Sequence, residues 1–337
     1  MSIMSVNGCH AEINCPQALT GNAVNALPPF AKVKAYVVDE YPACPKEWMH
    51  GSGKASSYFI GVEPGRGMWF DFTTNMYNDY DCAVVISVQG VNPLTGQKVA
   101  GLRLEQYKDQ CPIHKVDFLQ DRFCSECEYK WPAQNYIATT TGQSLWLDGF
   151  RNGSGEVRQY ILTEEEVNRG VAQQMIGEDR VWAIGFAFYK SKEKKPVTLD
   201  NKSKMFSQMA SAQYGMCNTL SGSWINCSDS HHKFSHNSLA RSLSANTPVF
   251  DMSIDDEYEE LTSFGDIVSS KKVEIGAGSR ISQEIGVDNN DTDYWESEPA
   301  GLIYVNYTTL DHVSKILDAG KRKELKEGFL NSVKVGN

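Results

Sequence analysis

CAVVISV, residues 82–88, is a continuous apolar run in the first third of the chain. A run of this kind is typical of a β-strand that is buried on both faces. Shorter apolar runs precede it at 57–62 (SYFIGV) and 68–72 (MWFDF), and turn-forming residues lie between the runs at 63–67 and 75–81. Short strands at this spacing predict a mainly β protein, an antiparallel sandwich or jelly-roll-like domain.

The same pattern continues after residue 140. Strand-like runs at 145–150 (LWLDGF) and 156–162 (EVRQYIL) flank a Gly-rich turn at 152–155, which predicts a hairpin. A further apolar strand is predicted over 180–189 (RVWAIGFAFY).

One or two helices are expected among these strands. Thr163 and Glu166 have the spacing of a capping box, with Thr163 as the N-cap. Val171 and Met175 then lie on one helical face, and Gly177 suits the residue after the last turn.

The C-terminal part predicts a strand over 302–307 followed by a helix. Thr309 is the expected N-cap of this helix, and Val313, Ile316 and Leu317 form its apolar face. We therefore expect a small strand–helix extension after the main domain.

Composition changes along the chain and suggests four segments. The formal net charge is −10, but residues 251–300 alone hold 14 acidic and three basic side chains. The acidity is therefore local, and the rest of the chain is nearly neutral. The predicted segments are a polar leader (1–30), a β-sandwich-like domain with a zinc module at 108–131 (31–195), a Ser/Asn-rich linker (196–250), and an acidic segment with the strand–helix unit (251–337).

Composition also excludes several classes of protein. Hydrophobic residues make up 41% and aromatic residues 11%, which is too much for a wholly disordered chain. No stretch approaches the roughly 18 consecutive apolar residues of a membrane span. The acidic balance argues against a nucleic-acid partner. The first residues lack the basic start and apolar core of a secretory signal, so we expect a cytoplasmic protein, or one exported without a Sec signal.

Two short motifs predict a metal site. Cys111 and His114 enclose two residues, Cys124 and Cys127 enclose two more, and nine residues separate the pairs. Two such turns can supply the four ligands of a tetrahedral ion, and three thiolates with one imidazole favour zinc. Four protein ligands close the site, which indicates a structural ion. A disulfide or redox pair and plain buried thiols are the alternatives. Glu128 stands where many such turns carry Gly, so the second turn is expected to be less regular.

Five strand residues form a second candidate site. Trp69, Asp71, Trp146, Asp148 and Tyr160 could make an aromatic and carboxylate surface for a sugar or another ligand. The competing interpretation is that these aromatic side chains belong to the core.

Three functions follow from these features. The first is a structural or self-assembling β-sandwich protein, a filament, shell or other homo-oligomer, whose main partner is itself and whose zinc is structural. The second is a carbohydrate- or ligand-binding module with a glycan or protein ligand. The third is a hydrolase with a carboxylate active site, but no catalytic motif is present, which favours a non-enzymatic role.

Overall fold

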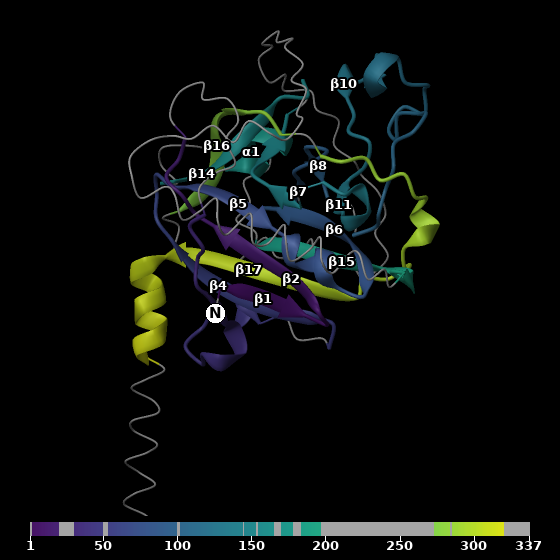
Figure 1. Cartoon of the computed structure of the whole chain (residues 1–337). Coiled ribbons are helices and arrows are strands. Elements are labelled where there is room, and N and C mark those ends of the chain that lie inside the picture. Colours follow the sequence, from purple (N-terminus) through teal and green to yellow (C-terminus); the bar gives the residue numbers. More distant parts are fainter. Residues whose placement is uncertain are drawn as a thin grey trace, which may run out of the picture.

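The structure is a computed structural model that describes ten stretches of the chain (Figure 1). They are residues 2–19, 30–49, 53–99, 102–143, 145–152, 154–164, 170–177, 183–196, 273–283 and 285–319. Within them the protein is mainly β, with two large sheets and one small hairpin. The predicted fold class is confirmed.

The larger sheet has eight strands, ordered β3-β4-β17-β15-β6-β7-β8, with β11 paired to β6. Most neighbours are antiparallel, whereas β17 runs parallel to β4 from Leu302↔Ala55 to Thr309↔Val62. Its strands are β3 (Ala35–Val37), β4 (Ala55–Val62), β6 (Tyr80–Val88), β7 (Val91–Asn92), β8 (Gln97–Lys98), β11 (Tyr136–Ala138), β15 (Ile184–Lys194) and β17 (Gly301–Thr309).

The second sheet has seven strands, ordered β1-β2-β5-β14-β13, with β12 paired to β5 and β16 paired to β14. The predicted hairpin at 145–162 supplies β13 and β14. The strands are β1 (Ile3–Val6), β2 (Cys9–Asn14), β5 (Gly67–Asp71), β12 (Trp146–Leu147), β13 (Gly149–Arg151), β14 (Val157–Thr163) and β16 (Glu274–Ile281).

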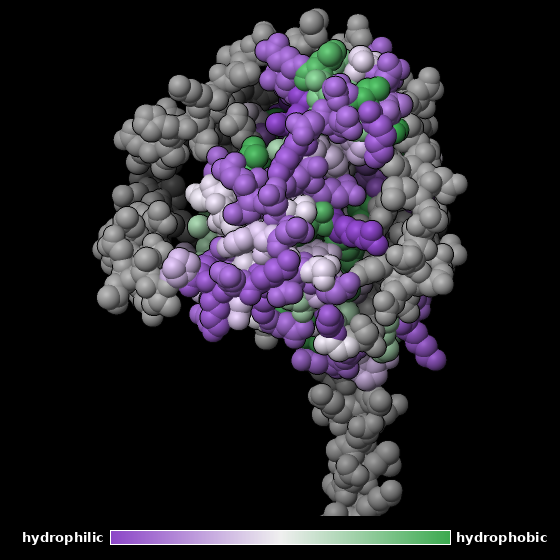
Figure 2. Space-filling model, turned by 90° about the vertical axis from the view of Figure 1, so that its right-hand side faces the viewer, coloured by the Kyte–Doolittle hydropathy of each residue, from purple (hydrophilic) through white to green (hydrophobic). Residues whose placement is uncertain are grey.

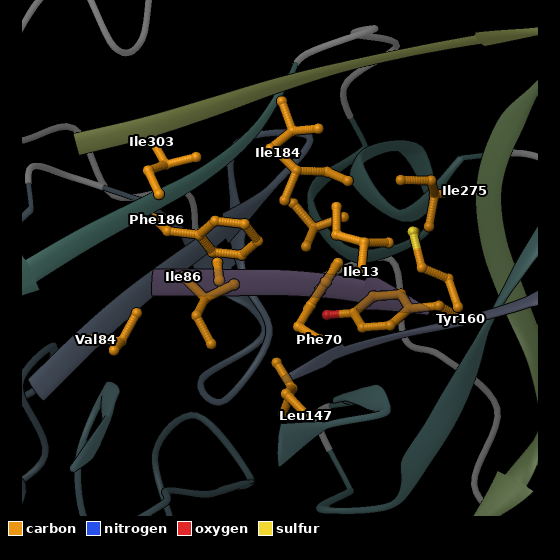
Figure 3. Close-up of a cluster of buried hydrophobic side chains, with 14 of the residues drawn as sticks. Ile13, Phe70, Val84, Ile86, Leu147, Tyr160, Ile184, Phe186, Ile275 and Ile303 are labelled. Atoms are coloured by element: carbon orange, nitrogen blue, oxygen red, sulfur yellow. The ribbon is translucent and has the colours of Figure 1, made fainter. Parts of the chain in front are cut away.

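The main core lies between the two sheets (Figure 3). Phe70 and Tyr160 come from the seven-stranded sheet, while Ile86, Phe186 and Ile303 face them from the eight-stranded sheet. The rings of Phe70 and Phe186 meet edge to face with centroids 5.3 Å apart. Burying each such side chain stabilises the fold by about 1.5–3 kcal/mol, and the contact across the sheets makes the architecture a sandwich.

Strand β6 is buried on both faces, as its apolar run predicts. Val84 and Ile86 point into the main core, whereas Val85 belongs to a second cluster on the outer face. There it packs with Tyr136, from the neighbouring strand β11, and with Trp295, which lies outside the strands of the sheet. A strand that is buried on one face only alternates apolar and polar residues. The continuous apolar run of β6 therefore reflects the second cluster on its outer face.

Both ends of the described chain contribute strands to the sheets. The predicted polar leader contains β1 and β2, where Met4, Ala11 and Ile13 are buried in the main core. β17 lies between β4 and β15, and β16, from the predicted acidic segment, pairs with β14. The predicted linker lies outside the described residues, apart from Pro196.

The helix predicted to begin at Thr163 needs a correction. Thr163 is the last residue of β14 and pairs with Glu274 of β16, and residues 165–169, which follow it, lie outside the described residues. Helix α1 spans Val171–Ile176, and Gly177 after it has φ +71°, the left-handed conformation expected there. The N-cap of α1 is Gly170 rather than Thr163, whose backbone is held in the ladder with β16.

The predicted C-terminal helix is confirmed over residues 310–319. The Thr309 Oγ1 accepts a hydrogen bond from the backbone N–H of His312 at 3.3 Å, as an N-cap does. Val313 and Ile316 pack on Phe59, on the outer face of β4. No helix of the described residues is long and apolar enough to cross a membrane.

The remaining elements are short. They are the 3₁₀ helices η1 (Val38–Glu40), η2 (Lys46–Trp48), η3 (Thr73–Tyr77), η4 (Gln120–Arg122), η5 (Thr139–Thr141) and η7 (Thr292–Tyr294), and the two-stranded hairpin of β9 (Phe123–Cys124) and β10 (Tyr129–Lys130). The hairpin belongs to the 108–131 module, which stands off the upper right of the sandwich in Figure 1.

Candidate metal centre

The first turn of the 108–131 module holds Cys111 and His114 together. The backbone N–H of His114 points to the Cys111 Sγ at 3.5 Å, and the N–H of Lys115 donates to the Cys111 carbonyl at 2.9 Å. Lys115 has φ +56°, which turns the chain back sharply after the histidine. An amide aimed at a thiolate stabilises the charged form of the sulfur.

The second turn connects β9 to β10 and carries Cys124 and Cys127. Glu128 follows with φ +49°, so it adopts the left-handed conformation for which Gly is usually selected. A non-glycine residue pays strain of about 1 kcal/mol there. The second turn therefore reverses the chain directly after its second ligand, as the first turn does after His114. The strain at Glu128 is the local cost of placing the sulfurs of Cys124 and Cys127 on one side of the turn.

All four predicted ligands meet at one point. One ligand atom from each of Cys111, His114, Cys124 and Cys127 lies within 4.8 Å of the others. The His114 Nδ1 is 3.9 Å from the Cys111 Sγ and 3.7 Å from the Cys124 Sγ, and the sulfurs of Cys111 and Cys127 are 3.9 Å apart. The structure thus brings together the side chains that the spacing predicts, and the cluster could hold a metal ion.

The thiols of this cluster differ in acidity. Burial acts to raise the pKa of Cys124, but hydrogen bonds from the Cys127 backbone and from His114 outweigh it and lower the pKa to about 7. Burial, with Cys124 beside it, raises the pKa of Cys127 to about 12. Of these two thiols, Cys124 is therefore the one that loses its proton more readily to an incoming cation.

The disulfide alternative does not describe this structure. The seven described cysteines are free thiols, and the Sγ atoms of Cys111 and Cys127 are 3.9 Å apart. A disulfide needs about 2.05 Å.

Aromatic side chains of the module pack against the cysteine–histidine cluster. Tyr107, Tyr129 and Trp131 pack with Cys111 and Cys124 in one buried group. The Trp131 ring is 4.9 Å from that of Tyr107 and 5.1 Å from that of Tyr129, centroid to centroid. These three residues were not predicted from the sequence, although aromatic residues that flank the two motifs were the available signal.

The module is fixed to the sandwich through the β7–β8 turn. The Tyr129 hydroxyl donates a hydrogen bond to the Thr95 carbonyl. A Cβ on Gly96 would lie 3.1 Å from that hydroxyl and 2.6 Å from the Arg151 carbonyl oxygen. Gly96, at φ +65°, therefore allows the close approach of module, turn and β13.

The five residues of the predicted ligand surface do not all lie at the surface of the protein. Trp69 and Tyr160 are buried at 1% and 0% exposure, and Asp148 is buried at 7%. Asp71 and Trp146 are partly exposed and lie opposite each other in β5 and β12. Three of the five side chains are therefore withdrawn from solvent in this structure.

Asp148 and Tyr160 form an unusual buried pair. The Asp148 Oδ1 and the Tyr160 hydroxyl are both buried without a hydrogen-bond partner in the described part of the chain. Burial raises the pKa of Asp148 to about 7. Burial, and then the charge of Asp148, raises the pKa of Tyr160 well above its ordinary value. Near neutral pH the pair favours a neutral carboxylic acid beside a neutral phenol.

Comparison with protein-family models, with curated proteins and with solved structures gives no significant match to this chain.

Proposed function

We propose that the 108–131 module binds one zinc ion and that this ion is structural. The observation that carries the proposal is the convergence of Cys111, His114, Cys124 and Cys127 within 4.8 Å. A zinc ion about 2.3 Å from tetrahedral thiolates has ligand edges of about 3.8 Å. Three of the six separations between ligand atoms, at 3.7 to 3.9 Å, agree with this geometry, and all six lie within 4.8 Å.

The donor set supports zinc over harder ions. Thiolates and imidazole are soft or borderline ligands, whereas calcium and magnesium select oxygen. Four protein ligands also leave no open position for water or substrate, which supports a structural role over a catalytic one. Because the module has only a small aromatic core, metal binding would supply much of its folding free energy.

The zinc proposal can be tested by pairing two cysteine variants. We expect Cys124→Ser to lose bound zinc and to expose residues 108–131 to limited proteolysis. Cys44→Ser is the matched control, because Cys44 is a buried free thiol in a different cluster of the sandwich. Equal zinc content and equal protease resistance in the two variants would contradict the proposal.

We propose further that the protein is a non-enzymatic structural β-sandwich that associates with copies of itself. Support comes from the closed metal site and from one apolar side chain of the module, Leu119, which is 57% exposed. Figure 2 shows a mainly hydrophilic face, on which hydrophobic side chains form only small groups among the coloured residues. An interface on that face would therefore be held mainly by polar and charged contacts, with few apolar side chains buried in it.

Light scattering tests this second proposal. Self-association predicts a mass above that of one 37.6 kDa chain at micromolar concentration, with a salt dependence if charges contribute. A monomer at every salt concentration and pH would refute it. The seven described cysteines, none of them in a disulfide, support a reducing compartment such as the cytoplasm. Glycan binding and carboxylate hydrolysis stay predictions, since Asp148 and Tyr160 lie inside the sandwich.

A further inference from the structure

Three polar side chains meet on the outer face of the seven-stranded sheet, at the end of β2. Ile13 is buried in the main core, so Glu12 and Asn14 on either side of it lie on the outer face. Both are nonetheless buried, at 5% and 0% exposure. Lys32, from the segment that leads to β3, forms an antiparallel bridge with Asn14. The three side chains therefore come from two separate parts of the chain.

Backbone hydrogen bonds place the side chains of Asn14 and Lys32 next to each other. The N–H of Cys15 donates to the Ala31 carbonyl at 2.8 Å, and the residue after Lys32 donates to the residue before Asn14 at 2.9 Å. Asn14 and Lys32 are therefore a non-hydrogen-bonded antiparallel pair, in which the Cα atoms are about 4.5 Å apart and the side chains are closest. Both side chains leave the backbone on the same face.

The amine of Lys32 lies against a carboxylate. Its Nζ is 2.5 Å from the Glu12 Oε2, and the Glu12 side chain is only 7% exposed. Glu12 precedes Asn14 by two residues on the same face of β2, so the Lys32 side chain extends from its place opposite Asn14 towards Glu12. A carboxylate within hydrogen-bond distance of an ammonium group can accept a proton from it.

The amide group of Asn14 is held in an unequal way. Its Oδ1 accepts a hydrogen bond from the Ala31 N–H at 3.1 Å, whereas its buried Nδ2 makes no hydrogen bond within the described part of the chain. A backbone N–H on the carbonyl oxygen polarises the carbonyl and stabilises negative charge that develops there during attack by a nucleophile. A buried amide nitrogen without a partner is unfavourable, and its departure would remove that cost.

Aromatic rings cover the other side of Asn14. In the sheet Asn14 pairs with Trp69 of β5, which is 1% exposed. The ring of Phe30 meets that of Trp69 edge to face, with centroids 5.1 Å apart. This packing keeps bulk water away from the Asn14 amide carbon, and water is the nucleophile that would compete with Lys32 there.

We propose that an intramolecular isopeptide bond joins the Lys32 Nζ to the Asn14 Cγ, with Glu12 carrying the proton. The ammonium group passes a proton to Glu12, and the neutral amine attacks Cγ. The Nζ–Cγ bond forms and the Cγ–Nδ2 bond breaks. Lys32 gives up two protons in all and the leaving nitrogen takes both, so it departs as ammonium and Glu12 returns to its carboxylate form. The reaction changes no oxidation state.

The bond would connect the two sheets of the sandwich through the chain that links them. Asn14 ends β2 of the seven-stranded sheet, and Lys32 lies three residues before β3 of the eight-stranded sheet. An amide bond would then hold the entry to β3 in addition to the hydrogen bonds of the Asn14–Lys32 bridge. The link involves no residue of the 108–131 module, so it does not depend on zinc.

Intact-mass spectrometry of the denatured full chain tests the proposal. The wild type should be lighter than its sequence by one ammonia, about 17 Da. Trypsin should fail to cut after Lys32, the first Lys or Arg of the chain, because its amine is acylated. Lys32→Arg keeps the charge without the nucleophile and should keep its ammonia. Glu12→Gln should slow the loss at least about hundredfold, since it removes the proton carrier.

Lys194→Arg is the matched control, because Lys194 also pairs with a carboxylate, that of Asp79 at 3.3 Å, but lies opposite Tyr80 and not opposite an asparagine. It should lose ammonia as the wild type does. Masses are compared between variants, so processing common to all of them cancels. Wild type that keeps its ammonia and is cut after Lys32 would overturn the proposal. So would a loss of ammonia that persists in Lys32→Arg, which would place the reaction at another residue. An unchanged rate in Glu12→Gln would overturn the role of Glu12.

Discussion

Replacing Asp148 by Asn should make the sandwich more stable at alkaline pH. Asp148 is 7% exposed, and its Oδ1 has no hydrogen-bond partner among the described residues. Burial raises its pKa from 3.8 to about 7. Unfolding releases the carboxyl to water, where its ordinary pKa returns, so the unfolded chain loses this proton at lower pH than the folded one.

The direction and the size of the pH effect on stability follow from this difference in pKa between the folded and the unfolded state. Between pH 4 and pH 7 the folded state binds more protons at this site, so stability falls as the pH rises and is level again above the folded pKa. A shift of about three pH units corresponds to about 4 kcal/mol at about 1.4 kcal/mol per unit. An Asn side chain has nearly the same shape as the Asp148 side chain but does not titrate. The variant should therefore exceed the wild type by about 2 kcal/mol at pH 5.5 and by about 4 kcal/mol at pH 8.5.

Urea unfolding followed by tryptophan fluorescence measures this gap at several pH values. Because both proteins carry the same metal site, metal effects cancel in the difference. Asp79→Asn is the control, since Asp79 is 77% exposed and pairs with Lys194 at the surface. A gap between Asp148→Asn and the wild type that does not widen with pH would refute the reasoning.

Three further substitutions test the packing, each by urea unfolding. Gly96→Ala should cost about 1–3 kcal/mol, because φ is +65° and the new Cβ would lie 2.6 Å from the Arg151 carbonyl oxygen; unchanged stability would contradict the close approach. Thr309→Ala should cost about 1 kcal/mol through the lost N-cap, and Thr309→Ser should recover most of it. Phe186→Ala should cost about 3–5 kcal/mol, because its ring meets Phe70 across the sheets; a loss below 1 kcal/mol would argue against the sandwich core.

The strands were predictable wherever apolar residues are dense. The runs at 82–88 and 180–189 became β6 and β15, the paired central strands of the larger sheet. By contrast, β16 has the sequence EIGAGSRI, whose glycines and charges are poor strand signals. It forms a strand because it pairs with β14 at six positions, from Val157↔Ile281 to Thr163↔Glu274, which is a tertiary effect.

There is a physical reason why the metal ligands could be predicted from the sequence and the exposure of the ligand surface could not. The metal ligands were predictable because each turn is closed by contacts between residues three apart, and such local geometry is encoded in spacing. The ligand surface depended on which face of each strand meets solvent. Trp69 and Tyr160 are covered by side chains remote in the sequence, so alternation alone did not reveal their burial.

The most direct test of the account is metal analysis of the native full-length protein combined with X-ray absorption at the zinc edge. We expect about one zinc per chain, bound by three sulfurs at about 2.3 Å and one nitrogen at about 2.0 Å. Less than half an equivalent of zinc, or a first shell made mainly of oxygen, would contradict it.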